Sequence, residues 1–310
     1  MAAHDVRAQP PCPAISVVVG VTTSSARVDR LLDALASQDG AGDVEVILVS
    51  TVSLSVSTRW LERLSSRHAF RDLQVVQAPL TMLTPELWRI GLERARGIIV
   101  AFTTSEMIPT ATWLRAIQRE HEGPWVGVGG TIACDPQSGI MGWATYLARY
   151  HAFMPANRRR LVPHIAGDNA TYKRWALEAV RPTWQHGFWE AEVHSELVAR
   201  GFELALEPAL LVEYHCQHRA GQFVVQRFRH GLRYGLSRGA SLSFGTAFLR
   251  TLLAPGIPAL LLARIWRNAR AAGEASRVLL AAPLLLLFLA SWASGEMAGY
   301  ARRLFSRRSG

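Results

Sequence analysis

Short apolar runs alternate with stretches of helical spacing through the first 130 residues, and this alternation limits the folds open to the chain. The runs at 15–21, 44–49 and 98–102 have the composition of strands buried on both faces of a parallel sheet. Between the first two runs, Val28, Leu31 and Leu35 recur at the spacing of one helix face. The sequence therefore predicts an α/β domain with a doubly wound, mainly parallel sheet and helices on both faces.

Further elements complete this prediction. We expect a weaker strand at 73–76, a fifth strand at 125–128 that closes at Gly129 and Gly130, and Gly97 as the residue that follows a helix end. After residue 130 the regular alternation stops, and two short strands are expected at 204–206 and 210–214. The remaining expected helices lie at 26–37, 58–67, 85–96, 110–119, 141–153, from 175 onward, 187–200 and 222–238.

Four segments are predicted from this pattern. Residues 1–13 are polar and proline-rich, and we expect a mobile tail. Residues 14–130 form the first α/β half, residues 131–240 the second half of the same domain, and residues 241–310 a hydrophobic helical region. The N-terminus lacks an apolar signal core, and the three cysteines are isolated, so we expect reduced thiols in a cytosolic compartment.

The charge is strongly positive. The formal net charge is +10 and the sequence pI is about 10.5, almost wholly from arginine, since Lys173 is the only lysine. This balance favours anionic lipid or phosphate-bearing partners. No RNP, zinc-finger or basic-zipper pattern is present, so we expect no nucleic-acid partner.

Two uncharged runs mark the C-terminal third. Residues 251–263 include Pro255 and Pro258, and residues 278–295 form a run that reaches about 27 Å as a helix, against a hydrocarbon core of roughly 30 Å. Arginines flank both runs, so the positive-inside rule assigns no orientation. Three alternatives stay open: a shallow hairpin in the cytoplasmic leaflet, a pair of tilted spans, or a buried helix pair of a soluble protein.

A polar turn follows the apolar run at 98–102. Three hydroxyl residues, 103–105, precede Glu106, and Pro109 leads into a predicted amphipathic helix. In open α/β sheets, ligands bind beyond the carboxyl ends of the strands. A lone carboxylate there is a candidate for holding a metal ion on a phosphorylated substrate, while a capped turn is the structural alternative.

A second polar cluster lies in the other half. It comprises the segment 167–174 (GDNATYKR), Glu190 and Glu192 at the start of a predicted helix, and His215 at the end of a predicted strand. Acids in a first helical turn also oppose the helix macrodipole, which is a sufficient structural reason for them. An ordinary strand-end histidine is the alternative for His215.

Together these segments resemble a family 2 glycosyltransferase with the GT-A fold, over about residues 15–238. The family's nucleotide-contacting acids fall here on Ser50 and Thr51. Its Asp-x-Asp motif falls on 104–106, so only Glu106 keeps an acid. Gly167 and Asn169, followed by Arg174, resemble the G-x-N…R segment of the acceptor side.

The resemblance implies roles for single residues. Glu190 falls where the family carries its catalytic base, with Glu192 as the alternative, and Glu106 and His215 would hold Mg²⁺ or Mn²⁺ on the donor diphosphate. Arg229 follows Gln226 as in a Q-x-x-R-W element, with His230 in place of the tryptophan, and a solvated or lipid-facing basic helix is the favoured alternative. The residues expected on the donor side are Thr22, Ser50, Thr51, Thr104, Asn169 and Arg229.

The implied activity is inverting transfer of a sugar from a nucleotide-sugar donor to a polyprenyl-linked, glycolipid or polysaccharide acceptor. The apolar C-terminal helices would contact membrane lipid and keep the catalytic domain on the cytoplasmic side of the cell (inner) membrane. The missing acids favour an alternative, an inactive relative that serves as a binding or assembly subunit of a polysaccharide machine. A nucleotide-binding protein of another α/β family would need a phosphate loop, and no such motif follows any predicted strand.

Overall fold

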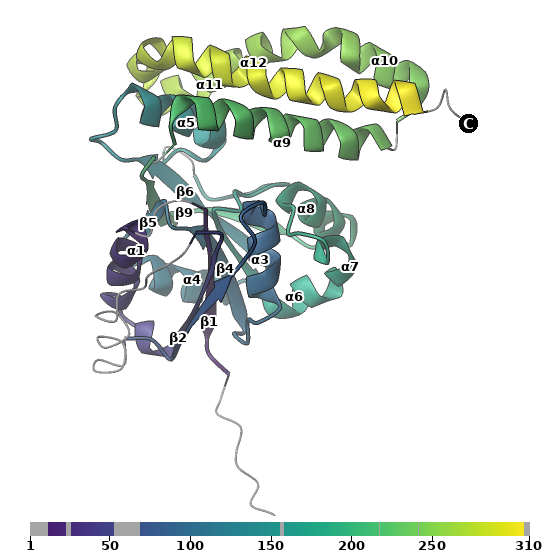
Figure 1. Cartoon of the computed structure of the whole chain (residues 1–310). Helices are drawn as coiled ribbons and strands as arrows, with labels where there is room; N and C mark the ends of the chain where they lie inside the picture. Colours follow the sequence, from purple (N-terminus) through teal and green to yellow (C-terminus); the bar gives the residue numbers. More distant parts are fainter. Residues whose placement is uncertain are drawn as a thin grey trace, which may run out of the picture. The chain divides into compact units, whose positions relative to one another are not determined.

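A computed structural model of the chain describes residues 12–22, 26–52, 69–155, 158–216, 218–240 and 242–306 (Figure 1). The chain divides into two compact units. Unit 1 comprises residues 1–131 and 158–212, and unit 2 comprises residues 132–157 and 213–310. The expected helix near 58–67 and most of the expected N-terminal tail lie outside the described residues. The functional division expected at residues 130 and 240 stays a prediction.

Four strands form the parallel part of the sheet, as the apolar runs predict. They are β1 (Ile15–Val21), β2 (Val44–Ser50), β3 (Asp72–Gln77) and β4 (Ile99–Thr104), in the order β3-β2-β1-β4. β1 pairs parallel with β2 and with β4, and β2 pairs parallel with β3. Every residue of β1, β2 and β4 is buried, which explains why most of their side chains are apolar.

The sheet continues past β4 with strands that reverse direction. β8 (Asn169–Lys173) pairs antiparallel with β4, and β6 (Gly127–Cys134) pairs antiparallel with β8. β9 (Leu204–Tyr214) and β5 (Met107–Pro109) follow in the sheet, and β7 (Arg160–Leu161) pairs antiparallel with β9. β8 lies within the segment GDNATYKR, for which the sequence predicted no strand.

Two predicted strand boundaries are wrong. β6 does not close at Gly129 and Gly130 but continues to Cys134. A Cβ atom on Gly130 would lie 1.8 Å from the carbonyl oxygen of Leu210, so this glycine permits a close approach between neighbouring strands rather than a turn. The two short strands expected at 204–206 and 210–214 are one continuous strand, β9, which passes through Pro208.

Helices cover both faces of the sheet, as predicted. Successive residues of a strand point to opposite faces, so Thr171 and Tyr172 of β8 face different layers. His121 lies with Nε2 2.8 Å from Oγ1 of Thr171, and His194 lies with Nε2 2.7 Å from the Tyr172 hydroxyl. The helices of unit 1 are α1 (Ala26–Ala36), α3 (Thr84–Leu92), α4 (Trp113–His121), α6 (Arg174–Ala179), α7 (Arg181–Trp184) and α8 (Glu190–Ala199), with a short 3₁₀ helix, η1 (Ala41–Asp43). His121 ends α4 and His194 belongs to α8, so these two helices lie on opposite faces.

The predicted end of the third helix is also wrong. α3 ends at Leu92, so Gly97 is not the residue that terminates it. The amide of Gly97 instead donates to the Ser16 hydroxyl at 2.7 Å, and the buried carboxylate of Glu45 accepts from Nε of Arg96 at 2.9 Å. A Cβ atom on Gly97 would lie 2.5 Å from the Ser16 nitrogen, which explains the glycine.

Unit 2 is helical apart from the ends of β6 and β9. Its long helices α9 and α12 lie side by side (Figure 1). A Cβ atom on Gly231 would lie 2.1 Å from the Trp292 carbonyl oxygen, and one on Gly295 would lie 2.1 Å from that of Phe228. The two backbones are therefore in direct contact. The helical elements are α5 (Ile140–Tyr150), η2 (His151–Phe153), α9 (Ala220–Ala240), α10 (Phe244–Leu253), η3 (Ala254–Gly256), α11 (Ile257–Ala271) and α12 (Ala275–Ser306).

Two segments of unit 2 are candidate membrane spans by length and composition: Phe244–Ala271 and Ala275–Arg302. The first joins α10, η3 and α11, and the second lies within α12. Several large apolar side chains of both segments are exposed, so neither segment is fully buried within this chain. The most exposed of them are Phe244, Phe248, Leu252, Leu253, Leu260, Leu279 and Leu280. The choice among the three alternatives stays a prediction.

Candidate functional site

The carboxyl ends of β1, β2 and β4 meet at one edge of the sheet, as the parallel pairing requires. The register pairs Gly20 with Thr104 and Val21 with Ser50. The amide of Ser105 donates to the Gly20 carbonyl at 3.3 Å, which ties the turn after β4 to the end of β1. The structure therefore brings four predicted donor-side and metal-binding residues to one edge: Ser50, Thr51, Thr104 and Glu106, with Thr22 directly after β1.

The turn between β4 and β5 holds the candidate metal-binding groups of unit 1. Glu106 is buried in this turn, with 6% of its surface exposed. The hydroxyl of Thr104, where the resemblance expects an acid, is buried and has no hydrogen-bond partner among the described residues. One carboxylate and one hydroxyl are hard oxygen donors, which fit Mg²⁺ or Mn²⁺ bound mainly through substrate phosphates and water.

The hydroxyls at the end of β2 already have main-chain partners. Oγ of Ser50 donates to the Val52 carbonyl at 2.7 Å and accepts from the Val52 amide at 3.2 Å. The amide of Thr51 donates to the Val21 carbonyl at 3.0 Å, and its hydroxyl lies 3.5 Å from the same oxygen. Both residues are buried, and together they fix the geometry at the ends of β1 and β2.

Asn169 begins β8 and pairs in register with Thr103, so it lies at the same edge. Its side chain is fully buried. The amide nitrogen donates to the carbonyls of Thr131 and Leu210, at 3.0 and 2.8 Å, and the amide oxygen accepts from Nε1 of Trp113 at 2.9 Å. These contacts fasten the loop before β8 to the sheet and to α4, so the geometry favours a positioning role for Asn169 over direct donor contact.

Glu190 lies against this loop. A Cβ atom on Gly167 would lie 3.3 Å from Cδ of Glu190 and 2.7 Å from Cζ3 of Trp88. Trp88, on α3, in turn donates from Nε1 to the Thr103 carbonyl at 2.9 Å. The indole therefore connects the carboxyl end of β4 with the loop that lies against Glu190.

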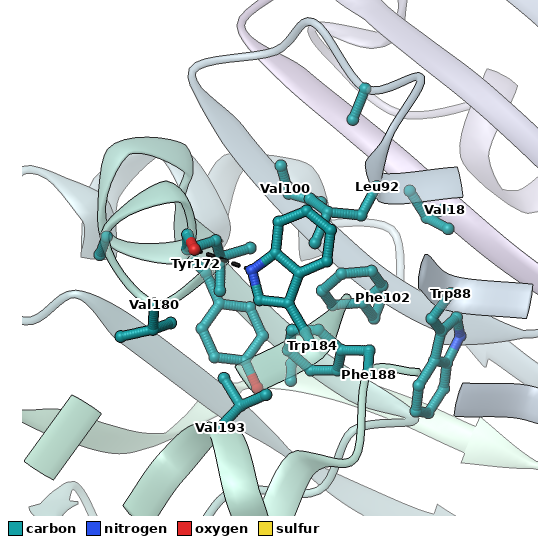
Figure 2. Packing of buried hydrophobic residues seen from close by; sticks show 14 of the residues in the cluster. Val18, Trp88, Leu92, Val100, Phe102, Tyr172, Val180, Trp184, Phe188 and Val193 are labelled. Atoms are coloured by element: carbon teal, nitrogen blue, oxygen red, sulfur yellow. Dashed lines mark hydrogen bonds between the residues drawn. The ribbon is translucent and has the colours of Figure 1, made fainter. Parts of the chain in front are cut away.

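An aromatic cluster fixes the start of α8. Figure 2 shows Phe188 packed among Trp88, Phe102, Tyr172 and Trp184. The ring centroids of Phe102 and Phe188 lie 4.4 Å apart, and Phe188 is fully buried. Its amide also donates to the Pro85 carbonyl at 2.8 Å. Because Glu190 follows Phe188 by two residues, this anchoring holds the carboxylate in place.

The two candidate bases lie on different faces of α8. The buried residues of this helix are Val193, His194 and Leu197, three, four and seven residues after Glu190. Glu190 therefore shares the inward face, whereas Glu192 lies with the half-exposed Glu196. Burial, first of all, and then the charge of Glu190 raise the pKa of Tyr172, which places this carboxylate near the core of unit 1.

His215 and Arg229 belong to unit 2. His215 follows β9, is buried, and lies with Nδ1 2.9 Å from a carboxylate oxygen of Asp135 and Nε2 3.5 Å from one of Glu213. Arg229 is exposed on α9. Within the described ranges, no group of three or more histidine, cysteine, aspartate or glutamate side chains is arranged to hold a metal ion. The metal-binding role of His215 stays a prediction.

Two residues at this edge were not singled out from the sequence. Trp88 belongs to no recognisable sequence motif. It contributes to the site through a hydrogen bond to the main-chain carbonyl of Thr103, which is distant in the sequence. Asp168 is a buried carboxylate between Gly167 and Asn169. Its place within the G-x-N segment was the only signal that could have drawn attention to it.

Comparison with known proteins places the fold. No protein-family model matches the sequence, and no curated protein matches it. The structure is similar to the mannosyltransferase PcManGT from Pyrobaculum calidifontis, solved in complex with GDP-Man and Mn²⁺, with a TM-score of 0.56 and 17% identity, over 96% of this chain and 88% of that chain. It is also similar to GalNAc-T7, solved with UDP, GalNAc and Mn²⁺, with a TM-score of 0.50 and 12% identity, over 67% of this chain and 45% of that chain.

Proposed function

We propose that this chain, which has a mixed α/β fold similar to that of GT-A glycosyltransferases, is an inverting glycosyltransferase that uses a nucleotide-sugar donor. The observation that carries the proposal is the position of Glu190. It lies on the inward face of α8, against Gly167 and beside Trp88, which binds the end of β4. A carboxylate at the carboxyl edge of such a sheet is where an acceptor hydroxyl would need a base.

Glu190 is the proposed general base. Its carboxylate takes the proton from the acceptor hydroxyl as that oxygen attacks the anomeric carbon of the donor sugar. The new glycosidic bond forms on the face opposite the departing nucleoside diphosphate, so one displacement inverts the configuration. Trp88 and Phe188 keep the carboxylate in position for this proton transfer.

The departing diphosphate needs positive charge to balance it, and a divalent cation would supply this when bound. Glu106 and Thr104 are the unit 1 oxygens proposed to hold Mg²⁺ or Mn²⁺. His215, in unit 2, stays a candidate nitrogen ligand on the strength of the sequence resemblance alone. The Mn²⁺ in the solved complexes of both similar proteins supports a cation of this class.

The proposed acceptor is lipid-linked, and unit 2 is the proposed membrane anchor. The exposed apolar side chains of α10 to α12, surrounded by arginines, support contact with lipid. On this proposal the enzyme works at the cytoplasmic face of the inner membrane. Thr22, Ser50, Thr51 and Arg229 stay proposed donor-side residues, with their main-chain groups as the better candidates at 50 and 51.

A matched pair of variants tests the base. E190Q removes the proton acceptor and keeps the size of the side chain, and E192Q makes the same change two residues along on the outward face. We expect E190Q to lower kcat for sugar transfer by about 10²-fold to 10⁴-fold, the usual contribution of a general base. Nucleotide affinity, measured by calorimetry with UDP or GDP and Mn²⁺, should change little, and E192Q should keep its activity. Normal turnover by E190Q would refute this assignment.

A second function has a specific observation in its favour. The positions of three family acids are taken by Ser50, Thr51 and Thr104, and the first two hydroxyls contact the main chain. An inactive relative that binds saccharide or assembles with a synthase would tolerate these changes. If no nucleotide binds to the wild-type chain with or without Mn²⁺, this alternative replaces the transferase.

A further inference from the structure

The net positive charge of the chain comes from unit 2. Counted over the full sequence, unit 2 has 15 arginines against 4 acidic residues, a net of +11, whereas unit 1 has 19 basic and 20 acidic residues, a net of −1. The sum matches the formal charge of +10. Unit 2 therefore gathers arginine without the carboxylates that would balance it.

One of these arginines is half-buried in the helical unit. Arg227 of α9 has its Cζ atom 6.0 Å from the ring centroids of both Phe223 and Trp292. Its Nε atom is buried without a hydrogen-bond partner, and no carboxylate in the described part of the chain forms an ion pair with this guanidinium. A buried donor of this kind destabilises the fold when it is left unsatisfied, and more so when it is charged.

The groups around Arg227 are also basic. Burial and then the charge of Arg149, at the end of α5, lower the pKa of Arg227 to about 10. Burial, Arg227, Arg149 and His218 lower the pKa of His230 to about 3, and burial and Arg149 lower that of His218 to about 4. Among the groups of the described residues, Tyr150 is the one that raises the pKa of Arg227. We call Arg149, Arg227, His218 and His230 the basic cluster.

We propose that the basic cluster binds a phosphate group, with the guanidinium of Arg227 as its central donor. The buried and unpartnered Nε, the two rings that hold the guanidinium and the lack of a carboxylate at this arginine carry the inference. Guanidinium groups match phosphate oxygens in geometry and charge. An anion there would satisfy the buried donor and offset the repulsion between the charged Arg227 and Arg149.

The phosphate has two sources in principle, a free anion or a lipid headgroup. The position of the cluster favours the lipid. Trp292, which contacts Arg227, lies in α12, and this helix presents the exposed Leu279, Leu280 and Leu286 along a candidate membrane span. An acyl or prenyl chain would find its apolar environment there. The further identification of this lipid as the sugar acceptor rests on the proposed transferase function, whereas phosphate binding does not.

Binding to the full-length protein in detergent or on vesicles tests the site. The first probe is inorganic diphosphate, measured by calorimetry. The others are two kinds of phosphatidylcholine vesicle: one contains phosphatidic acid, which is a phosphomonoester lipid, and the other contains phosphatidylserine at equal charge. We expect tighter binding to phosphatidic acid than to phosphatidylserine, and a loss of at least 10-fold in R227Q and in R149Q. R267Q removes an exposed arginine of α11 and is the matched charge control, with little expected change. Thermal unfolding reports whether each variant is folded.

The outcomes separate the sources and the hypotheses. Binding of diphosphate as well as phosphatidic acid means that the phosphate alone is recognised, and binding of the vesicles alone means that the whole headgroup region is. Equal binding of both lipids without diphosphate binding, or wild-type affinity in folded R227Q and R149Q, would overturn the proposal. E190Q should bind phosphate normally, so a failure of the phosphate site and a failure of the proposed transferase are distinguishable.

Discussion

Gly167 lies so close to Trp88 that a Cβ atom at position 167 would lie 2.7 Å from Cζ3 of the indole. The same atom would lie 3.3 Å from Cδ of Glu190. The absence of a side chain thus lets the loop before β8, the indole and the proposed base approach one another.

We expect G167A to impair transfer more than it impairs folding. The added methyl group must displace the indole ring or the Glu190 carboxylate, and a displacement of about 1 Å at a catalytic group costs about 10²-fold in rate. Steady-state kinetics measure this loss, and urea unfolding measures stability. G42A is the control, because a Cβ atom on Gly42 would meet no atom within 4 Å. Full activity in G167A would show that Glu190 is not held through this loop.

Removal of the Glu106 carboxylate should uncouple nucleotide binding from the cation. In calorimetry with UDP or GDP, we expect Mn²⁺ to strengthen binding to the wild type, and we expect E106Q to lose at least 10-fold of that enhancement. Binding without metal should be nearly unchanged. E93Q removes a carboxylate that forms an ion pair with Arg89 on α3 and serves as the control. Equal Mn²⁺ enhancement in E106Q and wild type would exclude Glu106 as a ligand.

Two buried histidines should make unit 1 sensitive to mild acid. Burial, first of all, lowers the pKa of His121 and of His194 to about 3, with smaller contributions from Lys173 and His164. The unfolded chain takes up these protons below about pH 6.5, while the folded chain stays neutral, so the unfolding free energy falls as pH decreases from about 6.5 toward 3. The expected slope is about 1.4 kcal/mol per pH unit for each histidine.

Urea unfolding at pH 7, 6 and 5 measures this slope. H194Q should reduce it, because glutamine keeps a hydrogen-bonding group near Tyr172 but takes up no proton. H186Q changes an exposed histidine in the loop before α8 and should leave the slope as in the wild type. Identical slopes in H194Q and wild type would show that His194 titrates alike in the folded and unfolded states.

The contact between α9 and α12 should tolerate no side chain at Gly295. A methyl group there would meet the Phe228 carbonyl oxygen at 2.1 Å, so we expect G295A to lower the unfolding free energy by about 1–3 kcal/mol. G245A, in α10, meets no atom within 4 Å and should raise stability by up to about 1 kcal/mol, because alanine favours helix over glycine. Thermal unfolding of the full chain in detergent compares the two; equal midpoints would argue against the close helix contact.

The strands that the sequence predicted correctly are those in which every residue has the same buried environment. β1, β2 and β4 are buried throughout, so their composition was sufficient. β8 was missed because it begins with Asn169 and ends with Lys173, polar residues that pair between two other strands. The glycines in β6 were interpreted as a strand end, although close contacts between strands explain them.

The candidate site was predicted in part for a similar reason. Glu106 and Glu190 have chemistry that a sequence displays, and the structure locates both around one edge of unit 1. Trp88 and Phe188 contribute through a main-chain hydrogen bond and through ring packing, which depend on residues far along the chain. Asn169 was expected to contact the donor, but its hydrogen bonds to Thr131, Leu210 and Trp113 could be known only from the fold.

The glycine contact between α9 and α12 also has a mechanical consequence. At these glycines the two helices touch backbone to backbone, with no flexible side chain there to absorb a shift, so we expect α9 and α12 to move together. The apolar surface is carried by α12 and the guanidinium of Arg227 by α9. A change in bilayer thickness that tilts α12 would therefore move Arg227 by a comparable angle, and membrane composition would reach the phosphate-binding cluster as a movement rather than as a chemical signal.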